Sequence, residues 1–162
     1  MLLRSDRRWT FPADRGAVWT AMCALDAYQG WWPWLSGFEA RALALGEVWT
    51  ATVQPPLPYR LRFTITLTEV RGAEAGAARV QGDVRGTARI DLADGPGGCE
   101  VHLVSDLGPG HRVLQAVAAV ARPVVQRSHD WVLDTGARQF VERALETGVP
   151  PEPPPAGGEA AA

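Results

Sequence analysis

Three residue types that together perform nucleophilic catalysis stand side by side in this sequence, at Ser128, His129 and Asp130. A serine, a histidine and a carboxylate act as nucleophile, base and orienting group in many hydrolases. The surrounding segment has a helical pattern, however, and consecutive residues of a helix point about 100° apart. These side chains therefore cannot hydrogen-bond to one another as a triad, and we do not interpret them as one.

Other motifs with a known chemistry are absent from the sequence. It contains no G-x-S-x-G, CxxC, HExxH, phosphate-binding loop or dinucleotide fingerprint. Its three histidines and two cysteines lack the close spacing of most zinc ligands. We therefore expect no metal, no cofactor and no disulfide scaffold. Whether the protein is an enzyme stays open at this point.

His129 is the one candidate that we identify for proton transfer, because it lies within an apolar stripe of the last helical segment. Two interpretations are open. It is either a core histidine bonded to a backbone carbonyl or a buried water, or a residue that contacts a ligand as a binding or acid/base group. His102 alternates with apolar neighbours and belongs on the outer face of a strand, so we give it no role.

Two helical segments flank the middle of the chain. A short strand over residues 7–11 leads into a helix that opens at Asp14 and runs to about residue 25. The aromatic segment 28–38, YQGWWPWLSGF, is interrupted by glycine and proline, so we expect one or two broken turns there. A second helix begins near His111, is interrupted at Pro123 and continues to about residue 145.

Between the helices the apolar residues recur with a period of two, which is typical of strands with one buried face. We expect an antiparallel meander whose outer face carries charges of both signs, such as Arg89 beside Asp91 and Arg85 beside Asp83. The expected strands are 39–43, 47–54, 59–70, 77–83, 85–93 and 98–107.

The terminal helix has one apolar face that is suited to packing against the sheet. Trp131 lies on its opposite, polar side and requires cover. The segment 113–120 could fold over it, or Trp131 could belong to a homodimer or membrane-surface patch. The apolar face comprises Val125, His129, Val132, Leu133, Gly136, Ala137, Phe140 and Ala144.

Inward-facing aromatic residues could line an apolar hollow or fill a packed core. A glycine in the middle of a helix costs about 1 kcal/mol relative to alanine, so Gly136 either makes room for a ligand or permits close packing. The candidate ligand-binding residues are Trp31, Trp32, Trp34, Trp49, Tyr59, Phe63, His129, Leu133, Gly136 and Phe140.

Three stretches of the sequence carry a resemblance to a known family. They are FPADRGAVWTAM with YQGWWPWL at 11–35, LPYRLRFTITLTEV with GDVRGTARIDL at 57–92, and ARPVVQRSHDWVLDTGARQF at 121–140. Their order resembles the START-like (SRPBCC) superfamily and its polyketide cyclase/dehydrase and lipid transport branch. The resemblance implies an α+β helix-grip fold, in which a curved antiparallel sheet wraps around a long C-terminal helix.

Composition limits the function further. A net charge of −2 disfavours nucleic-acid binding, and the longest apolar stretch, 113–121, is far shorter than the ~20 residues that span a bilayer. We expect a cytoplasmic protein without a leader, with one domain over 1–147 and a disordered Pro/Gly/Ala-rich tail over 148–162.

Three functions are compatible with these features. The first is binding or transport of a hydrophobic small molecule, such as a lipid, an isoprenoid or a polyketide-like compound. The second is a cyclase or dehydratase that uses the same cavity, with His129 handling the proton and a polar partner such as Tyr59. The third is a stress-response or protein-interaction module whose cavity is packed.

Deleting residues 148–162 should leave the melting temperature nearly unchanged, because this segment has almost no apolar side chains to dock and its prolines lack backbone donors. Thermal melts of the full and truncated chains test this. A drop of more than a few degrees would show that the tail packs on the domain.

Overall fold

Seven antiparallel strands form one curled sheet in the computed structural model, which describes residues 3–56 and 58–146. From β2 to β7 each strand pairs with its sequence neighbour, and β1 pairs with β7, which gives the order β1-β7-β6-β5-β4-β3-β2 with β1 and β2 at the two edges. The tail that we expect over 148–162 lies outside the described residues. The strands are β1 (Leu3–Phe11), β2 (Leu35–Glu39), β3 (Val48–Val53), β4 (Leu61–Arg71), β5 (Ala75–Gly82), β6 (Val84–Gly95) and β7 (Gly98–Pro109).

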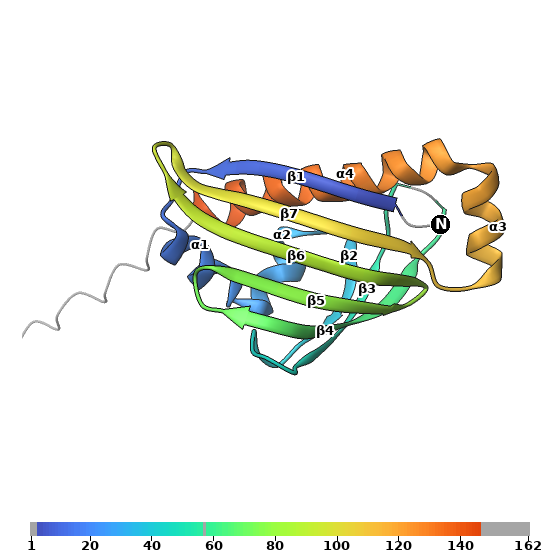
Figure 1. The fold of residues 1–162 in the computed structure, drawn as a ribbon, viewed down its shortest axis with the longest axis horizontal. Helices are drawn as coiled ribbons and strands as arrows, with labels where there is room; N and C mark the ends of the chain where they lie inside the picture. The colour runs from blue at the N-terminus through green and yellow to red at the C-terminus, as the bar shows by residue number, and fades with distance from the viewer. Residues whose placement is uncertain (1–2, 57, 147–162) are drawn as a thin grey trace, which may run out of the picture.

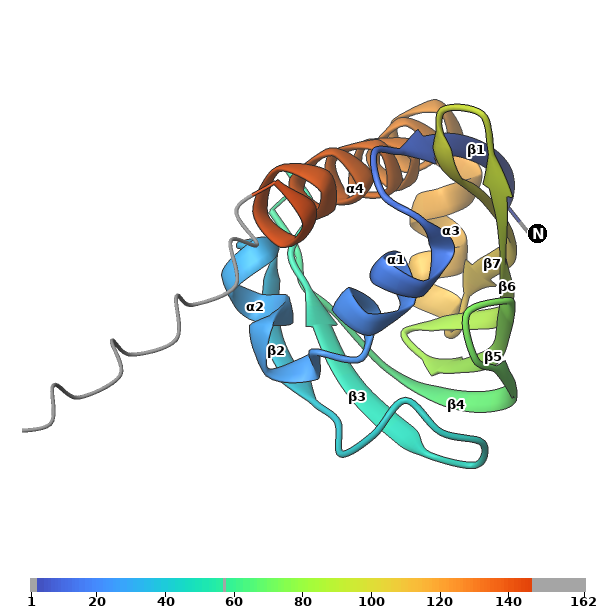
Figure 2. The same ribbon diagram turned by 90° about the vertical axis from the view of Figure 1, so that its left-hand side faces the viewer.

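The helices occupy the open side and the two ends of this sheet. Figure 2 shows the sheet curling around the interior with α4 across its open side, and Figure 1 shows α1 and α3 near opposite ends. The predicted α+β helix-grip fold is therefore confirmed. No helix within the described ranges is long and apolar enough to cross a membrane. The helical elements are α1 (Arg15–Met22), η1 (Leu25–Ala27), α2 (Tyr28–Trp31), α3 (Arg112–Val120), α4 (Arg122–Phe140) and the π-helical turn η2 (Val141–Leu145).

The first helix begins where the sequence predicts and ends earlier. The Asp14 carboxylate caps α1 by accepting a hydrogen bond from the backbone nitrogen of Ala17 at 2.8 Å. The helix stops at Met22, and two short helical turns follow before β2. One of them, α2, is a broken turn of the kind predicted for the aromatic segment 28–38, and the other, η1, precedes that segment.

The strand expected over 39–43 was placed too late in the sequence, since β2 spans Leu35–Glu39. The residues after it form a loop instead, in which a backbone carbonyl bonds to an indole and two side chains form an ion pair. The Trp49 indole nitrogen donates to the carbonyl of Ala42 at 2.9 Å, and Arg41 pairs with Glu47 at 2.6 Å. Neither interaction is visible in the period-two pattern from which the strand was predicted.

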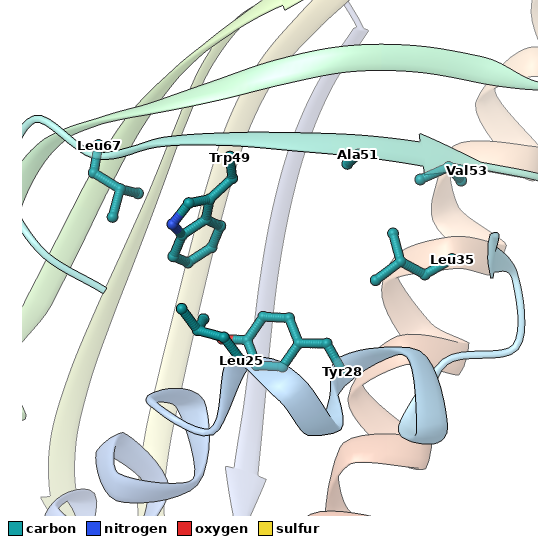
Figure 3. Packing of buried hydrophobic residues seen from close by; sticks show 7 residues of the cluster. All are labelled: Leu25, Tyr28, Leu35, Trp49, Ala51, Val53 and Leu67. Carbon is teal, nitrogen blue, oxygen red and sulfur yellow. The ribbon is translucent and has the colours of Figure 1, made fainter. Parts of the chain in front are cut away.

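Aromatic packing fills the α2 side of the interior. Figure 3 shows Tyr28 and Trp49 side by side between α2 and β3. Their rings are arranged edge-on, with 6.2 Å between the ring centroids. The buried Tyr28 hydroxyl donates to the carbonyl of Met22, and burial raises the pKa of this phenol. The members of this cluster are Leu25, Tyr28, Leu35, Trp49, Ala51, Val53 and Leu67.

Two tryptophans fasten α4 to the aromatic segment. The indole nitrogen of Trp32 donates to the carbonyl of Gly136 at 2.9 Å, and that of Trp34 donates to Gln139 Oε1 at 2.9 Å. A β-carbon on Gly136 would lie 3.2 Å from Cζ2 of Trp34. The glycine therefore serves close packing, which is the second of the two alternatives posed by the sequence, and its partner is an indole ring.

Gly136→Leu should destabilise the fold by about 1–3 kcal/mol, the usual cost of overpacking, because the larger side chain must displace the Trp34 ring. Urea unfolding measures the change. Gly136→Ala is the control, and we expect it to stay within about 1 kcal/mol of the wild type because its gain in helix propensity offsets a contact that is only slightly tight. A leucine variant as stable as wild type would contradict this packing.

Candidate functional site

A cavity of about 270 Å³ lies at the α3 end of the curled sheet, between the inner face of the sheet and helices α3 and α4. Its lining is almost wholly apolar, with a few polar groups contributed by a tyrosine, an aspartate, a serine and a histidine. The lining residues are Leu3, Trp34, Val53, Pro55, Tyr59, Leu61, Phe63, Val80, Asp83, Val84, Leu107, Gly108, Pro109, Leu114, Val117, Ala118, Val125, Ser128, His129, Val132 and Leu133.

The turn between β7 and α3 packs closely against the turn between β5 and β6 at this end of the molecule. A β-carbon on Gly110 would lie 1.7 Å from the carbonyl oxygen of Gly82, so only glycine allows the two backbones to approach so closely. The Gly110 nitrogen donates to the carbonyl of Asp83 at 2.7 Å. The backbone of β7 is thereby tied to the β5–β6 turn, and the chain reverses into α3 beside the cavity.

His111 and Asp83 fix the first turn of α3. Nδ1 of His111 accepts a hydrogen bond from the backbone nitrogen of Leu114 at 3.5 Å, and Nε2 lies 3.4 Å from the Asp83 carboxylate. An accepting Nδ1 requires the proton on Nε2 when the ring is neutral, which suits donation to the carboxylate. The sequence pattern placed Asp83 on the solvated outer face, whereas its side chain borders the cavity and the α3 cap.

His129 is the central polar group of the cavity wall. Its Nε2 lies 3.5 Å from the hydroxyl of Ser105, a buried residue on β7. Ser105 pairs with Ser5 on β1, and the buried hydroxyl of Ser5 has no hydrogen-bond partner among the described residues. A small polar cluster therefore lies behind His129 in an otherwise apolar wall, with hydrogen-bonding capacity to spare.

Burial lowers the pKa of His129 below its ordinary value of 6.5; the Asp130 carboxylate acts in the opposite direction, and the positive charge of Arg7 adds to the lowering. Arg7 on β1 also bridges to Asp130 at 3.1 Å and to Asp134 at 3.6 Å, which ties the first strand to α4. At neutral pH the imidazole is therefore uncharged. It offers one donor and one acceptor, as a ligand hydroxyl or carbonyl requires.

Five of the ten candidate ligand-binding residues line the cavity, namely Trp34, Tyr59, Phe63, His129 and Leu133. The other five are outside the lining and belong to the packed interior beside it, namely Trp31, Trp32, Trp49, Gly136 and Phe140. Phe140, for example, packs against the rings of Phe11 and Trp31 at 5.4 Å from each. Trp34 is the boundary residue, because its ring packs over Gly136 and also borders the cavity.

One part of the lining that sequence reasoning missed comes from α3. Leu114, Val117 and Ala118 of this helix border the cavity, whereas the sequence suggested cover of Trp131 as one of two roles for segment 113–120. That indole remains 39% exposed. The sequence does contain a hint of this arrangement. Segment 112–120 is apolar around nearly its whole circumference, so one of its faces could be buried against the cavity while another stayed exposed.

The donor set of the described residues does not suggest a metal centre. Over 3–56 and 58–146, no three histidine, cysteine, aspartate or glutamate side chains gather as ligands. Cys23 is exposed and Cys99 is buried, and both thiols are free. The cavity therefore offers apolar enclosure with a few polar residues in its wall, among them His129, Tyr59 and Ser128.

Comparison with known proteins identifies the fold. No protein-family model and no curated protein sequence matches the chain. Among solved structures, a Thermus thermophilus protein aligns with a TM-score of 0.70 and 14% identity over 91% of this chain and 99% of its own. A START superfamily protein from Mycobacterium smegmatis aligns with a TM-score of 0.67 and 15% identity, covering 88% of this chain and 97% of that one.

An aromatase/cyclase from a Streptomyces species aligns with a TM-score of 0.66 and 13% identity, covering 90% of this chain and 93% of its own. At these identities the shared property is the fold. The chain has the START-like helix-grip fold that the sequence resemblance implies, and its function has to be argued from its own cavity.

The lowered pKa of His129 predicts how stability depends on pH. Between the folded pKa and the ordinary value of 6.5, the unfolded chain binds more protons than the folded one, so the free energy of unfolding falls as the pH drops through that interval. His129→Gln should reduce this loss of unfolding free energy at acidic pH. Urea unfolding at neutral and mildly acidic pH measures it, and an unchanged pH dependence in the variant would contradict a half-buried, neutral His129.

Proposed function

We propose that this protein binds a hydrophobic small molecule in the cavity between the sheet and helices α3 and α4. The observation that carries the proposal is an apolar hollow of about 270 Å³ with His129 in its wall. Ligand sites in proteins are typically hollows of this kind, with few polar groups that orient the ligand. The START-like fold of the chain and of its Mycobacterium smegmatis neighbour supports the same class of function.

The size of the cavity limits the ligand. An apolar protein cavity of about 150 Å³ binds one benzene molecule, so a cavity of about 270 Å³ suits a compound of two fused rings or a short branched chain. The neutral imidazole of His129, with Ser105 behind it, favours a ligand that carries one hydroxyl or carbonyl group. The ligand class is thus a compact apolar molecule with a single polar end.

The hollow should bind naphthol more tightly than naphthalene. A net hydrogen bond contributes about 0.5–1.5 kcal/mol, which corresponds to a preference of about 2- to 13-fold. His129→Leu has similar bulk and should abolish the preference while leaving naphthalene affinity and the fold intact. Calorimetric titration of protein freed of copurifying compounds measures both ligands. If the variant unfolds, His129 is a structural hydrogen-bond partner and its role in binding is wrong.

A matched pair of substitutions on α3 tests whether the cavity itself is the site. Ala118 is buried and lines the cavity, whereas its neighbour Ala119 is exposed. Ala118→Leu should lower naphthol affinity at least about fivefold by overpacking the hollow, and Ala119→Leu should leave it unchanged. Equal affinity in both variants, or no binding by the wild type, would refute the proposal in favour of a non-binding interaction module.

Two observations favour a second candidate, a cyclase or dehydratase acting on a polyketide-like substrate. His129 and Tyr59 line the same cavity, and one structural neighbour is an aromatase/cyclase. The first step would be removal of a proton from a carbon between two carbonyl groups by the neutral imidazole. Wild type, but not His129→Leu, should then accelerate deuterium exchange at that carbon in a β-diketone, as followed by NMR.

A further inference from the structure

Large apolar side chains are exposed along α3 and the first half of α4. On α3 they stand at positions 113, 117 and 120, the spacing that places residues on one face of a helix. We call this set, together with the arginines described below, the corner patch. Its apolar members and their exposed fractions are Val113 at 71%, Val117 at 44%, Val120 at 89%, Val124 at 51% and Trp131 at 39%.

The two helices follow one another directly at this corner. A single residue, Ala121, separates them, and its carbonyl accepts a hydrogen bond from the nitrogen of Val124 at 2.9 Å. On α4, Val124 and Trp131 border a surface hollow of about 280 Å³ together with Pro56 and Pro123. An exposed apolar surface of this kind marks a site of interaction with another molecule.

The charge of the corner patch has one sign. Arg112, Arg122 and Arg127 are exposed, and they form no ion pair with another described residue. The sequence from 107 to 129 contains no aspartate or glutamate, although the chain as a whole has a net charge of −2. Asp130 and Asp134 follow on α4, but both are bridged to Arg7 on β1.

We infer that the corner patch docks on the anionic surface of a lipid bilayer. The valines are suited to insertion at the boundary of the acyl chains, and tryptophan favours the interface between membrane and water. Each arginine near an anionic membrane adds a favourable electrostatic contribution. A symmetric dimer through the same patch would instead bring the arginines of two copies together, which opposes that association.

This inference goes beyond ligand binding and does not require it. The two sites are nevertheless joined, because Val117 of α3 lines the cavity and is also 44% exposed in the corner patch. Ser128 of α4 likewise borders both the cavity and the surface hollow. Docking through this face would bring the apolar cavity next to the membrane, where compact apolar compounds dissolve.

Vesicle flotation tests the inference on the full chain. Vesicles of phosphatidylcholine and phosphatidylglycerol in equal amounts should carry the protein, and vesicles of phosphatidylcholine alone should carry much less. The double variant Arg122→Gln/Arg127→Gln should lose about 25-fold in binding, at about fivefold for each arginine. Val113→Gln/Val120→Gln should also weaken binding without lowering the melting temperature, because both side chains are exposed.

Matched controls lie elsewhere on the surface. Leu45 is 69% exposed in the β2–β3 loop, and Arg79 is exposed and unpaired among the described residues of the sheet. Leu45→Gln and Arg79→Gln should bind vesicles as the wild type does. Equal binding to both vesicle types, or equal effects of control and patch variants, would overturn the inference.

Sedimentation equilibrium provides the opposing outcome. A wild-type dimer that becomes monomeric in Val113→Gln/Val120→Gln, with no vesicle binding, would show that a second copy covers the patch and would overturn membrane docking. Naphthol affinity, measured on the same samples, tests ligand binding independently of membrane docking. We expect it to be unchanged in the arginine variants, whatever their vesicle binding.

Discussion

Gly136 on α4 lies in close contact with the indoles of the aromatic segment, and this contact holds the helix against the segment that precedes β2. Trp32 donates to the Gly136 carbonyl at 2.9 Å, and the Trp34 ring lies where a β-carbon would reach it at 3.2 Å. These contacts link residues more than a hundred positions apart in the sequence. They fix the distance between α4 and the aromatic segment, on the open side of the sheet that α4 crosses (Figure 2).

The interior is filled unevenly. Towards α1 and α2 the interior is closed by stacked and edge-on aromatic rings, with Tyr28 and Trp49 at the centre of one cluster (Figure 3). Beyond Trp34 most of the lining residues are aliphatic or small, Tyr59, Phe63 and His129 being the other members with aromatic rings, and a cavity of about 270 Å³ remains. A tightly packed half gives the domain its stability, because close packing is where apolar burial contributes most. The other half can then accommodate a ligand without contributing to that packing.

Much of this architecture could be predicted from the sequence, because it follows from local periodicity. The period of two predicted the hairpins, Asp14 predicted the start of α1, and Pro123 predicted the interruption between α3 and α4. The division of the interior could not be predicted, since Phe63 and Trp49 are both inward-facing aromatics and only the tertiary fold places one in the cavity and the other in the core. The face of α3 that covers the cavity could not be predicted either, because the helix has two apolar faces. Nor could the unpartnered hydroxyl of Ser5, because its surroundings depend on the pairing of β1 with β7.

Trp34 lies between the packed half of the interior and the half that we propose binds a ligand. Methyl NMR of the protein during titration with naphthol tests this division. Shifts should be large for the methyl groups of Val80, Leu114 and Leu133, which line the cavity, and absent for those of Val18, Leu25 and Leu67, which are buried in the packed half. Shifts spread equally over both sets, or shifts confined to the second set, would contradict the account.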